Sequence, residues 1–191
     1  EVFSVFQIKD INEKIIEKCK SNNSNLNFIK ADYSLDLSLK GDHQKQNASL
    51  ALAISKNILK GVNHNINKCL MSVNWHGRNQ TISSNPDVIF DVGHNQDGIE
   101  SFLNFIINAK KVYRKKTLLI SVQKKKNIAQ VSRKLDLFFD KKIYSITNSS
   151  RSMEYVEIQE YFNDIDYIEN PKKALENVIQ SAQNKDLIAI I

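Results

Sequence analysis

Short apolar runs alternate with amphipathic patterns in the C-terminal half of the chain. Five runs are rich in β-branched residues and almost continuously apolar, which is typical of strands buried on both faces of a parallel sheet. They read VIFDV, TLLISV, KIYSIT, DYIE and LIAII. The periodicity between them predicts helices over residues 97–111, 128–139, 154–162 and 171–183. This alternation predicts an α/β fold, with a mostly parallel sheet flanked by helices.

The N-terminal part has a mixed pattern. Apolar residues recur at helical spacing in several stretches, and strict alternation in SLDLSL is typical of a strand with one solvent-facing side. The predicted elements are a helix over 10–19, strands over 27–30 and 34–39, and helices over 47–59 and 66–73.

A polar, turn-rich segment, NQTISSNP, separates the two patterns. We therefore expect a domain boundary between Arg78 and Pro86, which divides the chain into residues 1–80 and 81–191. The first part is too small and open-ended for a complete nucleotide-binding domain. Because the chain does not begin with Met and ends inside LIAII, we expect it to be a segment of a longer protein.

The composition is that of a folded globular chain, with 41% hydrophobic and 25% charged residues among 191. No apolar run approaches the roughly 18 to 20 residues of a membrane-spanning helix, and the first residues lack a targeting pattern. The 27 Lys and Arg residues outnumber the 21 Asp and Glu residues, which favours anionic ligands. The basic residues are scattered without a nucleic-acid-binding motif, so we expect neither a nucleic-acid nor a membrane partner. Cys19 and Cys69 lack metal-site spacing, and we expect no metal held by them.

The segment DVGHNQDG, residues 91–98, lies where ligands bind in an open parallel sheet. It follows the strand VIF and precedes a helix, at the carboxyl end of that strand. Asp91 can accept from a ribose hydroxyl or hold a metal, and His94 can donate to a phosphate oxygen near a helix N-terminus, which favours anions. The alternative is structural: Asp91 or Asn95 caps the helix and His94 is a satisfied loop residue. The residues alone leave both interpretations open.

Two further segments carry candidate binding side chains. In GDHQKQNASLA, Asn47 has the amide donor and acceptor needed to read a purine edge, although capping or a surface role is the alternative. In NWHGRNQ, Arg78 follows Gly77, a setting in which its guanidinium can bind phosphate or carboxylate. The chain contains neither a GxxxxGK(S/T) loop nor GxGxxG, which excludes a complete P-loop enzyme.

The ordered combination of these segments resembles a known family. HQKQNASLALA, WHGR and PDVIFDVGHNQDG, in this order and spacing, resemble the folylpolyglutamate synthase and dihydrofolate synthase family of the Mur ligase superfamily. KKKNIA resembles that family's Lys-Asp-Ile segment, and Arg151 in SSRSM lies at the next strand end. The departures are Gln96, where the family usually has Pro, and Asn127, where it usually has Asp.

The resemblance covers essentially the whole chain and implies its domain organisation. Residues 1–80 would be the end of a partial α/β ATPase domain, the central domain of these ligases. Residues 81–191 would be the C-terminal glutamate ligase domain, which is Rossmann-like and truncated at its end.

The resemblance also implies an ATP-dependent acid–amino-acid ligase. A substrate carboxylate would attack the γ-phosphate of ATP, and the amine of L-glutamate would displace phosphate from the acyl phosphate. By the same resemblance, cofactor binding falls to Asn47 (adenine), Arg78 (phosphates), Asp91 (ribose or nearby phosphates) and His94 (a phosphate oxygen), catalysis to Arg78 and His94, and glutamate binding to Lys126 and Arg151. The implied cofactors are ATP and Mg²⁺, with the P-loop and magnesium ligands upstream of Glu1.

The implied enzyme adds L-glutamate to dihydropteroate, to the glutamate tail of folates, or to both, in folate biosynthesis and one-carbon metabolism. We expect a cytoplasmic monomer with small-molecule partners, and no activity from this segment alone because it lacks a P-loop. Two other classes remain open, a cell-wall amino-acid ligase of the same superfamily and a non-catalytic nucleotide- or anion-binding module.

Overall fold

A computed structural model describes residues 1–59, 65–124, 126 and 128–191. The contacts divide the chain into two compact units, Glu1–Trp75 and His76–Ile191. The boundary between the units thus falls a few residues before the segment in which the sequence places it, and Arg78 belongs to the second unit. Asn127, one of the two departures from the family pattern, lies outside the described residues. No helix among the described residues is long and apolar enough to cross a membrane.

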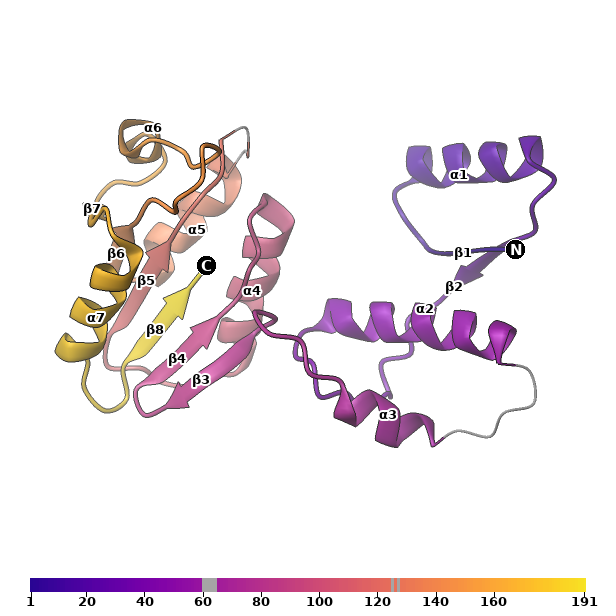
Figure 1. The fold of residues 1–191 in the computed structure, drawn as a ribbon, viewed down its shortest axis with the longest axis horizontal. Coiled ribbons are helices and arrows are strands. Elements are labelled where there is room, and N and C mark those ends of the chain that lie inside the picture. The colour runs from indigo at the N-terminus through magenta and orange to yellow at the C-terminus, as the bar shows by residue number, and fades with distance from the viewer. Residues whose placement is uncertain (60–64, 125, 127) are drawn as a thin grey trace. The chain divides into compact units, whose positions relative to one another are not determined.

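The first unit builds a small parallel sheet with helices around it (Figure 1). Strands β1 (Val2–Val5) and β2 (Leu26–Ile29) pair in parallel, and α1 (Lys9–Ser21) connects them. The chain continues into α2 (Asp42–Ile58) and α3 (Ile66–Ser72). Among the described residues of this unit, those that are buried are Cys19, Gln44, Ala48 and Ser49. Parallel strands are normally buried on both faces, so these half-buried strands leave the unit with little core of its own.

The strand predicted over residues 34–39 is wrong, because this segment is irregular. Its polar groups bond to helical residues and to a turn rather than to a neighbouring strand. The Lys45 ammonium on α2 donates to the Leu35 carbonyl, and Ser38 Oγ donates to the Leu70 carbonyl of α3 at 3.1 Å. The alternating leucines are thus half-buried without belonging to a sheet, an arrangement that periodicity alone cannot distinguish from a strand.

The second unit contains a six-stranded sheet in the order β3-β4-β8-β5-β6-β7. All neighbouring pairs are parallel except β3 and β4. The strands are β3 (Gln80–Ser84), β4 (Asp87–Phe90), β5 (Lys116–Ile120), β6 (Lys141–Tyr144), β7 (Asp166–Tyr167) and β8 (Leu187–Ile190). The predicted α/β class with a mostly parallel sheet is confirmed.

Helices cover both faces of this sheet (Figure 1). They are α4 (Gln96–Asn108), α5 (Ala129–Phe138), α6 (Tyr155–Gln159) and α7 (Pro171–Ser181). The larger core packs residues of α4, α5 and α6 against the sheet, including Phe102, Leu118 and Leu135. A smaller core packs α7 against the other face, around Ala174 and Ile188. Helices α4, α5 and α7 thus each bury an apolar face, whereas α6 covers only five of the residues predicted to be helical there and buries Ile158.

The antiparallel hairpin of β3 and β4 was not predicted. β3 falls in NQTISSNP, whose polar residues predicted a domain boundary. It is an edge strand with an irregular register, and all its residues are half-buried or exposed. A cis peptide bond between Asn85 and Pro86 makes the turn to β4. The polar segment in which the sequence places the boundary therefore contains a strand of the sheet.

Candidate functional site

A pocket of about 260 Å³ lies at the carboxyl ends of the parallel strands in the second unit. The chain passes from β4 outward to β5, β6 and β7 and returns through α7 to β8, which lies between β4 and β5. This reversal of strand order is the place where open α/β sheets bind ligands. Polar side chains in its lining are Asp91, His94, Ser121, Gln123, Ser145 and Thr147, and apolar ones include Phe90, Leu119 and Ile190.

Asp91 is a buried carboxylate with two backbone partners. It is 6% exposed, and its Oδ1 accepts from the amide of Gly93 at 2.7 Å while its Oδ2 accepts from the amide of Asn79 at 2.8 Å. These bonds tie the loop after β4 to the segment that leads into β3. Asp91 therefore shapes the site, and it does not cap α4.

The N-terminus of α4 packs closely against this loop. Asn95 is the N-cap, and its side chain accepts from the Gly98 amide at 2.9 Å. A Cβ on Gly93 would lie 2.9 Å from both Asp91 Oδ1 and the Gly98 carbonyl carbon, so the backbone can turn here only without a side chain. The structural interpretation is right for Asn95, and the helix N-terminus stays next to the pocket lining.

His94 is exposed and lines the pocket. Its Nδ1 lies 3.2 Å from the Val92 carbonyl, which fits an Nδ1–H donor and leaves Nε2 without a partner among the described residues. The imidazole is thus held at one nitrogen and open at the other. This geometry suits contact with a ligand oxygen when the ring is protonated.

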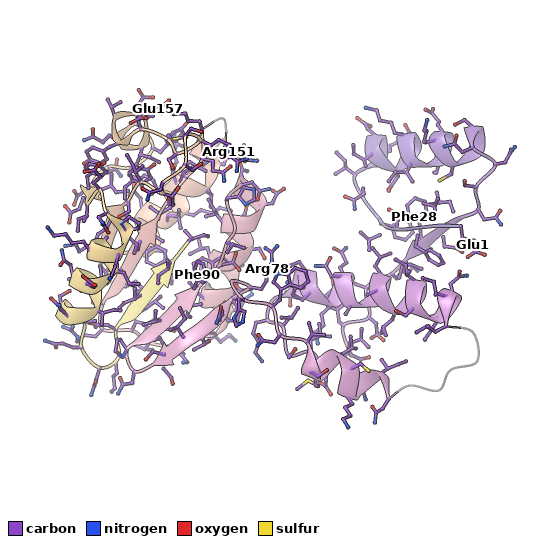
Figure 2. All side chains as sticks on the ribbon, in the orientation of Figure 1. Glu1, Phe28, Arg78, Phe90, Arg151 and Glu157 are labelled. Atoms are coloured by element: carbon purple, nitrogen blue, oxygen red, sulfur yellow. The ribbon has the colours of Figure 1, made fainter. Side chains whose placement is uncertain are left out.

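Arg78 has a fixed backbone and an exposed side chain. The Val92 amide donates to the Gly77 carbonyl at 2.9 Å on one side of it, and the Asn79 amide donates to Asp91 on the other. Gly77 has a φ of 72°, and a Cβ there would lie 2.5 Å from Val92 Cγ1. Figure 2 shows Arg78 on the segment that leads into β3. The structure therefore connects Arg78 to the Asp91 loop by backbone bonds.

Lys126 and Arg151 lie on two neighbouring loops at the same end of the sheet. Lys126 is half-buried, and its amide donates at 3.3 Å to the carbonyl of Gln123, which is a residue of the pocket lining. Arg151 is exposed on the loop after β6 (Figure 2). The Lys124 amide donates to the Arg151 carbonyl at 2.6 Å, so the two loops are joined.

Asn47 lies in the other unit, on the second turn of α2. It is exposed, and its Nδ2 donates to Gln44 Oε1 at 3.2 Å. Because α2 begins at Asp42, Asn47 is not a cap of this helix.

Four lining residues of the pocket were missed in the sequence: Ser121, Gln123, Ser145 and Thr147. Each follows TLLI or KIY within a few residues, so position after a predicted strand was the available signal. Serine and threonine occur in many structural roles, so their presence in a sequence does not by itself indicate a binding site. No group of three metal-ligating side chains forms among the described residues.

Comparison with known families decides the assignment. Residues 77–191 match the family described as Mur ligase, glutamate ligase domain. The chain belongs to the Mur ligase family. The matched range holds the entire Asp91 loop and both joined loops, so the pocket lies inside the glutamate ligase domain. No curated protein sequence matches the chain.

Solved structures share the fold over nearly the whole chain. Mycobacterium tuberculosis folylpolyglutamate synthase complexed with ADP and AMPPCP has a TM-score of 0.79 and 17% identity, covering 98% of this chain and 52% of that one. E. coli FolC in complex with DHPP and ADP has a TM-score of 0.80 and 20% identity, covering 100% and 50%. The bifunctional folylpolyglutamate synthase/dihydrofolate synthase of Yersinia pestis, complexed with AMPPNP and Mn ion, has a TM-score of 0.78 and 17% identity, covering 93% and 47%. This chain therefore spans about half the length of each.

Proposed function

We propose that this chain is part of an ATP-dependent amide ligase that adds L-glutamate to dihydropteroate or to the glutamate tail of folates. The main support is the pocket at the carboxyl ends of β4, β5, β6 and β8, which lies inside a glutamate ligase domain. His94 is exposed and lines this pocket, and Arg151 is exposed on an adjoining loop. The folylpolyglutamate synthases that share the fold support the choice of folates. The enzyme would act as a monomer in the cytoplasm.

The proposed reaction has two steps, both at charged oxygens. A substrate carboxylate attacks the γ-phosphate and ADP leaves, which gives an acyl phosphate; the glutamate amine then attacks the acyl carbon and phosphate leaves. In this proposal Arg78 and His94 neutralise charge on the transferring phosphoryl group, because a guanidinium and an imidazolium both donate to anionic oxygens. Lys126 and Arg151 hold the carboxylates of the incoming glutamate.

ATP would also contact Asn47 and Asp91 in this proposal. The exposed amide of Asn47 offers both a donor and an acceptor to adenine. Asp91 already accepts two backbone amides, and each of its carboxylate oxygens retains a lone pair for a ribose hydroxyl. Its first contribution is to fix the loop that carries His94.

Magnesium fits the proposed reaction, although the described residues do not form a protein cage for it. The described residues provide no cluster of three ligating groups. Magnesium commonly binds through substrate phosphates, water and one or two carboxylates, so it would enter with ATP.

The amino acid that binds tests this proposal. Titration of the chain with L-glutamate, D-glutamate, L-lysine and inorganic phosphate, followed by calorimetry or NMR, should rank L-glutamate first with a Kd of about 1 mM or tighter. Arg151→Ala should weaken L-glutamate binding about tenfold, the loss of one charge-assisted contact. Arg133→Ala on the exposed face of α5 is the matched control and should leave binding unchanged.

Other binding preferences would favour the two alternative functions. Preference for D-glutamate or L-lysine would indicate a cell-wall amino-acid ligase, and phosphate binding without amino-acid binding would indicate an anion-binding module. With ATP, magnesium, folate and L-glutamate, the chain alone should form no amide product, because its sequence lacks the P-loop that positions the γ-phosphate. Product above a protein-free control would contradict that part of the proposal.

A further inference from the structure

The loops after β5 and β6 pair with each other as a short antiparallel ribbon, residues 122–124 with 151–153. Gln123 and Ser152 form a β-bridge, the Met153 amide donates to the Val122 carbonyl at 2.8 Å, and the Lys124 amide donates to the Arg151 carbonyl at 2.6 Å. Gln123 lines the pocket. This loop ribbon therefore carries Arg151 at the pocket end of the sheet.

A buried hydroxyl fixes one strand of the loop ribbon from within its own loop. Ser152 is 4% exposed, and its Oγ donates to the Thr147 carbonyl at 3.0 Å. The Thr147 and Ser152 hydroxyls are 2.7 Å apart. Because the Ser152 proton is used on the carbonyl, Thr147 is the donor in this second bond. These bonds join Thr147 and Ser152 within one loop, directly next to Arg151.

A second buried hydroxyl supports the same strand from the core. Tyr144, the last residue of β6, is fully buried, and its phenol donates to the Met153 carbonyl. Burial, followed by the charge of Glu154, raises the pKa of Tyr144 to about 12, so the phenol remains a donor well into the alkaline range. The ring also stacks on Tyr155. The loop ribbon therefore rests on a rigid part of the sheet.

Arg151 itself combines a fixed backbone with an exposed head. Its amide donates to Ser149 Oγ at 3.2 Å and its carbonyl accepts from the Lys124 amide, while its guanidinium has no ion-pair partner among the described residues. A long side chain on a fixed backbone loses less conformational freedom when it binds a ligand than one on a mobile loop. Two hydroxyls that never meet the ligand can thereby affect its affinity.

From these contacts we infer that Tyr144 and Ser152 are positioning residues, whose buried hydroxyls hold the loop ribbon so that Arg151 meets an anionic carboxylate with its backbone already ordered. The inference rests on the proposed function for the identity of that ligand. That the two hydroxyls hold the loop ribbon is a property of the free protein and does not depend on which ligand binds.

Hydrogen exchange in the free chain tests the holding of the ribbon. Tyr144→Phe and Ser152→Ala each remove one hydroxyl and should speed exchange of the Lys124 and Met153 amides about 3- to 10-fold, the effect of one lost neutral hydrogen bond. The amide of Leu118 in the core should be unaffected. Tyr155→Phe is the matched control, because its phenol donates to the Ile165 carbonyl away from the ribbon.

Binding of L-glutamate tests the positioning of Arg151. Both variants should weaken L-glutamate binding severalfold in the wild-type background and cause no further loss in an Arg151→Ala background, a pattern that general destabilisation does not produce. Unchanged exchange at Lys124 and Met153 would overturn the inference, and so would faster exchange with unchanged affinity. If the wild-type chain binds no L-glutamate, the proposed function fails, while the exchange rates still decide whether the two hydroxyls hold the ribbon.

Discussion

The carboxylate of Asp91 accepts the backbone amide of Asn79 at 2.8 Å and so joins the loop after β4 to the segment before β3. The same carboxylate accepts the Gly93 amide, so one buried side chain sets the path of both segments. Arg78 precedes Asn79 and His94 follows Gly93. The two residues proposed to meet the transferring phosphoryl group are therefore positioned by a single carboxylate.

Removing one acceptor from Asp91 should cost stability in the second unit. Asp91→Asn keeps the shape but turns one accepting oxygen into an NH₂ group, which faces a backbone amide that then lacks a partner. We expect the free energy of unfolding to fall by about 1–3 kcal/mol. Urea unfolding measures this, with the exposed Asp97→Asn as control. Equal stability of both variants would mean that the bonds to Asn79 and Gly93 contribute little.

The close approach at Gly93 predicts an order of effects between two glycines. In Gly93→Ala, the new Cβ meets the Gly98 backbone at 2.9 Å, which cannot move without shifting α4. In Gly98→Ala, the new Cβ would lie 2.9 Å from Asn95 Oδ1, which can shift only by loosening its N-cap bond, and 3.1 Å from Gly93 Cα. The preference of alanine over glycine for a helix offsets part of this cost. Gly93→Ala should thus lose about 1–3 kcal/mol and Gly98→Ala less. Thermal unfolding of both variants checks the order, which a larger loss in Gly98→Ala would contradict.

Much of the second unit was predictable because its strands are buried on both faces and leave continuous apolar runs. Leu118 and Ile188, at the centre of the sheet, lie in such runs. The edge strand β3 was missed because it is polar and pairs through one side only. The position of His94 followed from its place after a strand. The partners of Asp91 did not, because the Asn79 amide reaches it only through tertiary structure.

The difference in burial between the units predicts unequal protection. Strands β5 and β8 lie at the centre of a covered sheet, whereas β1 and β2 are half-buried. Amides of β5 and β8 should exchange more slowly than those of β1 and β2, by a factor on the order of 100. Native-state hydrogen exchange by NMR measures the ratio. Equal protection of all four strands would show that the first unit is as stable as the second.

The buried phenol of Tyr144 predicts a loss of stability at alkaline pH. Burial raises its pKa to about 12 in the folded chain, against about 10 in the unfolded chain. The folded state thus favours the protonated form, and its contribution is complete below pH of about 10 and is lost as pH rises towards about 12. Tyr144→Phe should lose less free energy of unfolding over that interval than wild type. The exposed Tyr33→Phe should follow wild type, and identical curves for all three proteins would contradict the assignment.

The most direct test of the account is to locate where L-glutamate binds. In ¹H–¹⁵N NMR spectra of the chain, L-glutamate should shift the amides of His94, Ser121 and Thr147 in the pocket and of Arg151 on its loop. Residues at the opposite ends of the strands, such as Lys115 and Asp186, should stay unchanged. Arg151→Ala should reduce the pocket shifts, and Arg133→Ala should not. Shifts confined to residues outside the pocket, or none at all, would contradict the proposal that this domain receives the glutamate of a ligase reaction.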